Sequence, residues 1–174
     1  MTVVTELTPA LRQSLASYLA AHNTMTLATL GPDGPAAAAL FYAADERFRL
    51  YFLSEAGAAH VANLQRDRRV ALTIHEDYRD WRMIQGVQMR GIARRVDGPA
   101  ETARALQLYL QKFPFLETFL SDPRRAGELL SRKLGQSRFH VVEPRWARWI
   151  DNRAGFGTRY ECDLTALQEA DDAG

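Results

Sequence analysis

The 174-residue sequence has few of the features that identify a function directly. It contains a single cysteine, Cys162. One cysteine excludes an intramolecular disulfide and a zinc site built from several cysteines, and it suits a reducing cytoplasm. The formal net charge is only +1 at pH 7, because acidic residues elsewhere balance basic clusters such as 66–69. This balance argues against nucleic acid as the main partner.

Long apolar runs are also missing. No stretch is long enough to cross a bilayer, and an N-terminus that carries Glu6 does not show the pattern of a signal peptide. We therefore expect a cytoplasmic protein with no membrane partner. A length of 174 residues with 47% hydrophobic residues is typical of a single packed domain. Its ordered core is expected at about residues 8–164, followed by a flexible tail at 165–174.

The sequence carries no recognisable catalytic or metal-binding motif. It has no nucleophile elbow of the hydrolase type. His22, His75 and His140 are spread over separate predicted elements, without the spacing of metal ligands. The segment 155–157 has glycines but lacks the strand-to-helix context of a phosphate loop. We therefore predict no metal site and assign no catalytic residue.

Helix-capping and turn residues divide the chain into elements. Thr8 and Pro9 predict the start of a helix that ends near residues 22–23, and its apolar face is formed by Leu11, Leu15, Tyr18 and Leu19. Further helices are expected at 99–112 and 123–134. Strands are expected at 24–30, 35–43, 50–53, 69–75, 81–96, 139–142, 147–150 and, at a sheet edge, 158–162. Gly86 and Gly91 inside the long strand indicate bulges or close backbone approach.

This order of elements predicts a mainly β (α+β) fold. Several strands joined by tight turns favour a mostly antiparallel sheet that closes into a barrel flanked by helices. A doubly wound parallel fold is not expected, because strands and helices do not alternate regularly.

The segment Leu50–Leu64 is the most informative part of the chain. Its first four residues are apolar and rich in aromatics, which is typical of a strand buried on both faces. Ser54 is expected to cap the helix that follows, and His60 to lie one to two turns into it. A helix N-terminus with a hydroxyl and a basic group nearby favours the binding of phosphate.

The order of elements and the segment Leu50–Leu64 resemble the pyridoxamine 5′-phosphate oxidase-like split barrels, which are mostly FMN-binding homodimers. Four other segments resemble, more closely, a small uncharacterised bacterial subgroup related to the YhbP proteins: Phe41–Tyr42, Ile84–Gly91, Phe113–Pro114 and Trp149–Arg159. The resemblance covers about residues 10–164. It implies one antiparallel split β-barrel with flanking helices and a flavin at a homodimer interface.

The resemblance also implies positions for the FMN phosphate. In the oxidases, basic residues bracket the second strand, a Ser or Thr ends the third, and a basic residue follows in the next helix. Ser54 and His60 occupy the last two positions, whereas Ala38 and Ala43 replace the two basic residues. Each missing contact is of a kind that contributes about 1.5–3 kcal/mol. The affinity for FMN is therefore expected to be weak unless other arginines reach the phosphate.

Other cofactor contacts follow from the same resemblance. They are expected from Phe41, Tyr42, Gln85 or Gln88 and, in the partner subunit, Trp149 and Arg159. Because side chains alternate along a strand, Gln85 and Gln88 face opposite ways, and at most one reaches the flavin. The same alternation separates Trp146 from Trp149, with one in the core or dimer interface and the other over a pocket. Each candidate also has a purely structural interpretation, as a cap, a core residue or a surface residue.

The leading hypothesis is an FMN-dependent oxidoreductase that acts on an unknown small molecule. Oxidation of pyridoxamine phosphate is not expected, because the C-terminal arginine-histidine signature of the oxidases is absent. One alternative is a binding or sensor protein that carries haem or a deazaflavin. Another is a dimer without a cofactor, which Ala38 and Ala43 favour.

Overall fold

The structure is a computed structural model that describes residues 2–4, 6–117 and 135–169. The elements follow one another as β1 (Thr2–Val4), α1 (Pro9–Ala21), β2 (Thr24–Gly31), β3 (Gly34–Phe41), β4 (Ala43–Ala44), β5 (Leu50–Glu55), α2 (Ala59–Arg66), β6 (Arg69–His75), η1 (Trp81–Met83), β7 (Gln85–Arg95), α3 (Pro99–Lys112), β8 (Ser137–Asp151), η2 (Asn152–Ala154), β9 (Arg159–Asp163) and α6 (Thr165–Glu169). The helix predicted at 123–134 lies outside the described residues.

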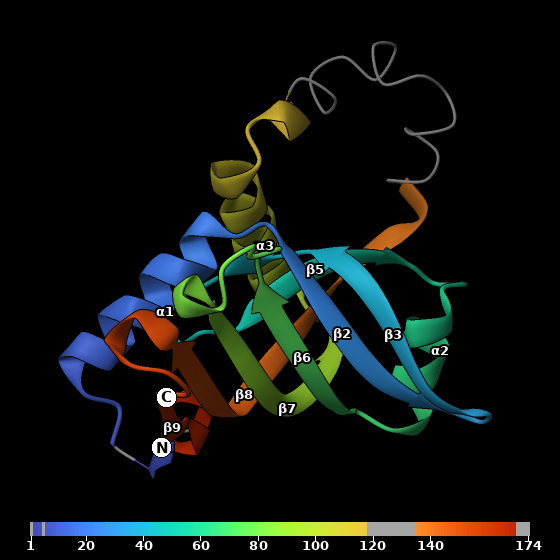
Figure 1. The fold of residues 1–174 in the computed structure, drawn as a ribbon. Helices are drawn as coiled ribbons and strands as arrows, with labels where there is room; N and C mark the ends of the chain where they lie inside the picture. The colour runs from blue at the N-terminus through green and yellow to red at the C-terminus, as the bar shows by residue number, and fades with distance from the viewer. Residues whose placement is uncertain (1, 5, 118–134, 170–174) are drawn as a thin grey trace.

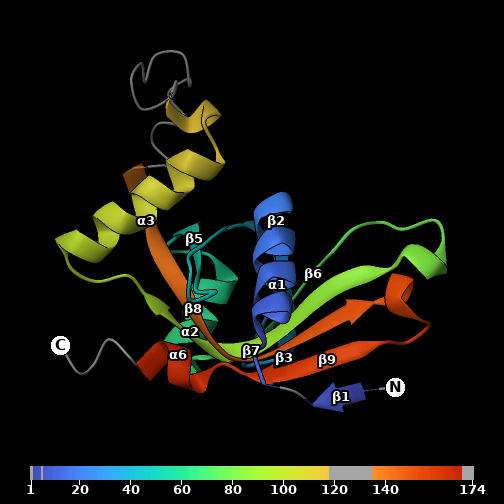
Figure 2. The ribbon, with the colours of Figure 1, turned by 90° about the vertical axis from the view of Figure 1, so that its left-hand side faces the viewer.

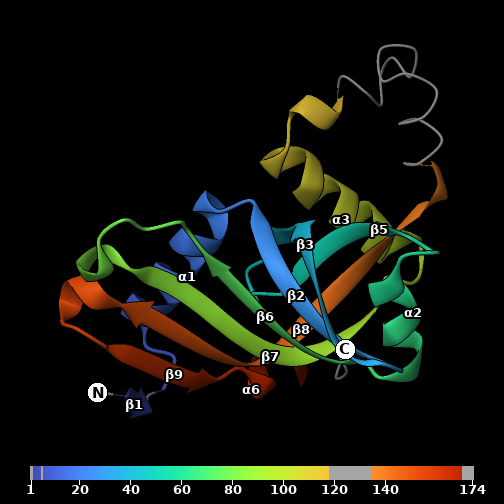
Figure 3. The ribbon, with the colours of Figure 1, turned by 45° about the vertical axis from the view of Figure 1, so that its right-hand side comes forward.

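The strands form one curled sheet, which Figure 1 and Figure 3 show from two directions. Its order is β1-β9-β8-β7-β6-β2-β3, and β5 joins the first half of β8 and carries β4 at its other edge. All pairs are antiparallel except β1 with β9. The curled sheet is half of a barrel, which confirms the predicted antiparallel split β-barrel with flanking helices.

Helix α1 packs against the inner face of the curled sheet (Figure 2). The hydroxyl of Thr8 accepts a hydrogen bond from the Leu11 N–H at 3.2 Å, which confirms the predicted start of the helix. Its four predicted apolar residues are buried, and the Tyr18 ring meets Trp149 edge-on at 5.0 Å. The strands contribute alternate side chains to the same core, among them Met25, Leu27, Leu72, Ile74, Val87, Met89, Val142 and Ala147.

Helix α3 covers the opposite face of β5 and of the first half of β8. Tyr51 and Val141 pack with Ala105 of this helix in a second apolar cluster, while Phe52 belongs to the main core. Strand β5 is therefore buried on both faces, as its aromatic sequence predicted.

Four predicted strands differ clearly in extent from the structure. The strand expected at 81–96 begins only at Gln85, because Asp80 caps a 3₁₀ turn by accepting the Arg82 N–H at 3.0 Å. The two strands expected at 139–142 and 147–150 are one continuous strand, β8. The strand expected at 35–43 ends at Phe41, and Ala43 starts the separate strand β4.

The strand predicted at 158–162 is present as β9 (Arg159–Asp163), but the prediction that it lies at the edge of the sheet was wrong. Strand β9 pairs with β8 on one side and with β1 on the other, so β1 is the edge. The three-residue strand β1 gives too short a pattern to be recognised in the sequence. Helix α6 occupies Thr165–Glu169, within the stretch expected to be a tail, and the Gln168 amide donates to the Arg47 carbonyl at 3.0 Å.

The predicted close approach at Gly91 is present. The register between β7 and β8 shifts between Arg90 and Gly91. A Cβ added to Gly91 would lie 2.2 Å from the Glu143 carbonyl oxygen, so only glycine fits there without a shift of the backbone.

Candidate anion-binding site

The junction between β5 and α2 differs from the prediction in one important respect. Ser54 does not cap the helix: it lies inside β5, and the N-cap residue is Ala58, which has no side-chain oxygen. His60 is the second residue of α2 rather than one to two turns into it. The helix starts later than expected because 56–58 form a loop, so the capping position passes from a serine to an alanine.

Ser54 and His60 nevertheless meet. The Ser54 Oγ lies 2.6 Å from the His60 Nε2, and Ser54 is only 7% exposed. Burial lowers the pKa of the half-buried His60, because a charged imidazolium is poorly solvated there. The pair therefore combines a hydroxyl with a mostly neutral imidazole beside the first turn of α2.

His140 extends this cluster from the neighbouring strand. Register pairs Phe52 of β5 with His140 of β8, and their rings stack at 5.3 Å. His140 is 5% exposed, and its Nδ1 lies 3.1 Å from the Arg138 carbonyl oxygen. Burial is the main cause that lowers its pKa, and the nearby His60 and Arg95 lower it further. The sequence did not identify His140 as a site residue, because its role depends on the pairing of β5 with a strand more than 80 residues later.

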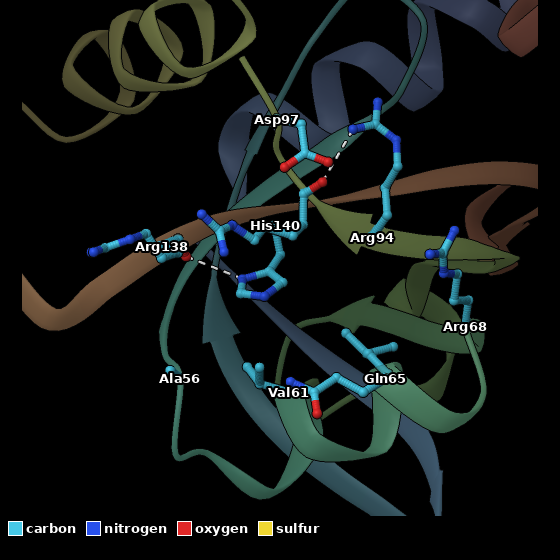
Figure 4. A pocket seen from close by; sticks show the side chains of 10 residues that line it. Ala56, Val61, Gln65, Arg68, Arg94, Asp97, Arg138 and His140 are labelled. Carbon is cyan, nitrogen blue, oxygen red and sulfur yellow. Dashed lines mark hydrogen bonds between the residues drawn. The ribbon is translucent and has the colours of Figure 1, made fainter. Parts of the chain in front are cut away.

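A cavity of about 380 Å³ opens between α2 and the ends of β7 and β8. Figure 4 shows His140 at its centre, with Val61 and Gln65 of α2 below it and basic side chains around it. The basic residues are Arg68, Arg94, Arg95 and Arg138. We call this cavity the arginine pocket. Its charge makes it suited to an anionic ligand.

The other predicted cofactor contacts lie elsewhere. Gln88 is on the outward face of the sheet, where its Oε1 accepts a hydrogen bond from Arg148 at 3.1 Å. Trp146 lies on the same face between Arg90 and Arg148, at 4.0 and 5.1 Å from their guanidinium carbons. These residues border a second, more open hollow with Thr26 and Thr73.

The predicted alternation of side chains is confirmed. Gln85 does not share the hollow of Gln88, and its amide donates instead to Asp151 at 3.0 Å. Trp149 is in the core at 5% exposure, whereas Trp146 borders the hollow. Arg159 is exposed on β9.

Phe41 and Tyr42 occupy different environments. Tyr42 is completely buried, and its hydroxyl donates to the Leu19 carbonyl at 2.9 Å. Phe41 is 54% exposed, and its ring meets that of Phe113, the residue directly after α3, edge-on at 5.3 Å. Their contact with a flavin stays a prediction, as does that of the other residues proposed for the cofactor.

The two alanines at the expected basic positions also lie apart. Ala38 is half-buried in β3, while Ala43 is 1% exposed in β4. Ala43 borders a pocket with Lys112, whose Nζ donates to the Leu19 and His22 carbonyls at 2.9 and 2.6 Å. Within the described residues, no three His, Cys, Asp or Glu side chains gather as a metal site would require. None of the described helices is both long and apolar enough to span a membrane.

Comparison with known proteins places this geometry in a family. The sequence is 26% identical over 147 residues to a UPF0306 protein of Klebsiella pneumoniae, which covers 84% of this chain and 88% of that protein. This relative fits the YhbP-like subgroup expected from the sequence. The conserved hypothetical protein Rv2991 of Mycobacterium tuberculosis has a similar fold, with a TM-score of 0.64 and 23% identity over 81% of this chain and 84% of that one.

A haem-binding protein of Mycobacterium smegmatis has the same fold, with a TM-score of 0.66 and 22% identity. The match covers 90% of this chain but 60% of that protein. At these identities, both structures establish the fold alone. The family model for pyridoxamine 5′-phosphate oxidase matches residues 11–148, well over half of the sequence. The chain therefore belongs to the pyridoxamine 5′-phosphate oxidase family.

Proposed function

We propose that this protein binds FMN and uses it in a redox reaction on a small molecule. The observation that carries the proposal is the uncapped start of α2 beside the Ser54–His60 pair. The first intrahelical bond of α2 joins the Ala62 N–H to the Ala58 carbonyl at 3.1 Å. The N–H groups of 59–61 precede that bond, and among the described residues no side chain caps them. Free N–H groups at a helix start favour a phosphate.

Ser54 and His60 suit the same phosphate. If the His60 Nε2 carries the hydrogen, it donates to the Ser54 oxygen and leaves the Ser54 O–H free to donate to the ligand. Protonation of His60 would add a charge-assisted bond. The alanines at positions 38 and 43 supply no charge, so the expected affinity is micromolar rather than nanomolar. The flavin would supply the redox chemistry, and we assign no catalytic side chain.

The proposal includes a homodimer. The outward face of β2, β3 and β6 carries small side chains, and Thr26, Ala37, Ala39 and Ala71 are exposed on it. Trp146 and its flanking arginines continue this face on β7 and β8. A sheet face of small residues, with a hollow beside one large aromatic side chain, suits packing against a second copy. The flavin would then lie where the two subunits meet.

The test of FMN binding begins with an absorption spectrum of the purified protein. FMN is then titrated, and binding is measured by the quenching of flavin fluorescence. We expect saturable binding, with the affinity reduced about tenfold in Ser54→Ala and in His60→Gln, because each loses one bond to a charged group. Ser17→Ala and His75→Gln are matched controls at exposed positions far from the junction, and they should bind FMN like wild type.

Two results would contradict the flavin proposal. A protein that shows no saturable response to FMN would favour a dimer without a cofactor. A Soret band in the spectrum would instead identify haem, the ligand of the Mycobacterium smegmatis haem-binding protein that has this fold. Equal FMN affinity in Ser54→Ala and wild type would move the phosphate away from the start of α2.

The dimer is tested separately by analytical ultracentrifugation. We expect a dimer for wild type and a shift toward monomer in Ala71→Arg, because a buried guanidinium without a partner is unfavourable in an interface. Ala62→Arg is the control, since Ala62 is exposed on α2, away from the small-residue face. A monomeric wild-type protein, or an Ala71→Arg variant as dimeric as wild type, would refute this interface.

A further inference from the structure

The arginine pocket contains charges that the flavin proposal does not use. Arg94 is neutralised by Glu101 and Glu143, each at 2.8 Å. In contrast, Arg68 and Arg95 have no carboxylate within ion-pair distance among the residues that the structure describes. Within the described part of the chain, the hydrogen bonds of the Arg138 guanidinium go to the main-chain carbonyls of Gly135 and Ser137. One acidic side chain, Asp97, borders the pocket.

The deepest polar group of the pocket is already oriented. The Arg138 carbonyl can only accept a hydrogen bond, so the His140 Nδ1 at 3.1 Å carries the hydrogen and the Nε2 holds the lone pair. His140 is almost fully buried, and its pKa is lowered mainly by burial. Protonation of Nε2 would give a second N–H donor at the base of the cavity.

The walls are not uniformly polar. Val61 and Leu64 of α2 and Ala56 of the preceding loop form an apolar side opposite the basic residues. Such a combination suits an organic anion whose charged end contacts the arginines and whose carbon skeleton covers the apolar side. A metal ion would be repelled by the same charges.

We propose that the arginine pocket binds a small organic dianion, a phosphate monoester or a dicarboxylate, between Arg95, Arg68 and His140. This site does not depend on the flavin. Ser54 and His60 are not among the residues that border the pocket, and α2 presents its start to the proposed flavin phosphate but its side to the pocket. The dianion is therefore a candidate substrate or effector rather than part of the cofactor.

Binding is coupled to proton uptake. The titratable and charged groups around His140 are His60 on α2, Arg95 and Asp97 at the end of β7, and Arg138 on β8; the side facing β5 is occupied by Phe52. The neighbouring positive charges disfavour the imidazolium, and an anion in the pocket reverses that balance. A phosphate monoester is itself protonated near pH 6, so the test uses a dicarboxylate, which stays mostly ionised: affinity for succinate should increase as the pH falls from 8 to 6.

The experiment is isothermal titration of the full chain at pH 7 with inorganic phosphate, glycerol 3-phosphate and succinate as probes. We expect saturable binding of at least one organic probe, weakened about tenfold in Arg95→Gln. Arg79→Gln is the matched control, because Arg79 is exposed in the loop before η1, and it should bind like wild type. Tighter binding of glycerol 3-phosphate would identify the ligand as a phosphate monoester, and tighter binding of succinate would identify it as a dicarboxylate.

Proton uptake gives a second readout that does not depend on a variant. Succinate titrations in buffers of different ionisation enthalpy should show uptake of up to one proton, and the His140 ring signals in NMR should shift on addition of succinate. No binding of any probe at concentrations up to about 50 mM, or identical affinity in Arg95→Gln and wild type, would overturn the proposal.

The flavin site and the dianion site are distinguished by measuring the affinity for both ligands in each variant. Ser54→Ala should weaken FMN and leave the dianion unchanged, whereas Arg95→Gln should do the reverse. Competition between FMN and glycerol 3-phosphate would overturn the second site, because it would make the arginine pocket the seat of the flavin phosphate. If FMN does not bind but the dianion does, the flavin proposal fails and the dianion site stands.

Discussion

Replacing Gly91 by alanine tests the most constrained point of the barrel. The added Cβ would lie 2.2 Å from the Glu143 carbonyl oxygen and 2.8 Å from the Pro144 Cα. Both neighbours are main-chain atoms and cannot rotate away. Strands β7 and β8 must separate by about 1 Å to restore ordinary contact, and overpacking of this kind destabilises by about 1–3 kcal/mol.

The net effect includes the unfolded chain. Alanine also restricts the unfolded state, which offsets about 0.4–1 kcal/mol of that loss, so we expect Gly91→Ala to lower the free energy of unfolding by about 1–2 kcal/mol. In a chain of this length, that lowers the melting temperature by about 2–8 °C. Urea unfolding followed by tryptophan fluorescence measures the free energy, and a thermal scan measures the temperature.

Gly57 and Gly86 provide the controls. A Cβ at Gly57 meets nothing within 4 Å, and one at Gly86 would lie 3.2 Å from the Ile74 carbonyl oxygen. The expected order of stability is therefore Gly57→Ala, then Gly86→Ala, then Gly91→Ala. If Gly91→Ala unfolds within about 0.5 kcal/mol of Gly57→Ala, the close approach of β7 and β8 at the register shift is wrong.

Three further predictions concern buried polar groups. The pKa values of His60 and His140 are lowered in the folded state, so at acid pH the unfolded chain binds more protons than the folded one. The free energy of unfolding should therefore fall as the pH is lowered from 7.5 to 5.5. In urea unfolding, a double variant with His60→Gln and His140→Gln should show a weaker dependence on pH. The side chain of Asp45 is fully buried, and its carboxylate binds Arg49 at 2.7 Å. In urea unfolding, Asp45→Ala should lower the free energy of unfolding by about 3 kcal/mol, whereas Asp33→Ala, at an exposed turn, should leave it unchanged. Lys112→Met removes both bonds to carbonyls near the end of α1 and should destabilise by about 1–3 kcal/mol in the same assay; an unchanged midpoint would show that those bonds contribute nothing.

Local sequence signals predicted the fold well where one element explains its own residues. The Thr8–Pro9 start, the buried face of α1, the aromatic strand β5 and helix α3 all follow from capping, periodicity and composition. The start of α2 was misplaced, because Ser54 is a good capping residue whose hydroxyl is taken by His60 instead. A competing side-chain bond of this kind cannot be seen in one sequence.

The candidate site was only partly predictable for a related reason. Ser54 and His60 are six residues apart, so a local motif brings them together. The arginine pocket instead joins α2, the end of β7 and the start of β8, and its centre depends on the pairing of Phe52 with His140. Contacts set by strand order and register are invisible to periodicity, which is why His140 was grouped with histidines that share no site.

The register shift explains both the broken pattern of β8 and the position of the two candidate binding faces. His140 and Val142 point inward at even positions, whereas Ala147 and Trp149 point inward at odd ones. The change occurs at exposed Arg145, which has no partner in β7 and whose carbonyl accepts the Leu164 N–H at 2.9 Å. Strand β7 keeps one phase, with Val87, Met89 and Ala93 buried. The extra residue thus lets one strand direct His140 toward the arginine pocket and Trp146 toward the outward face, and it does so at the point where β7 supplies a glycine. In the sequence of β8, the alternation of buried and exposed side chains reverses within five residues. This pattern resembles two short strands joined by a loop, which is why two strands were predicted where the chain has one.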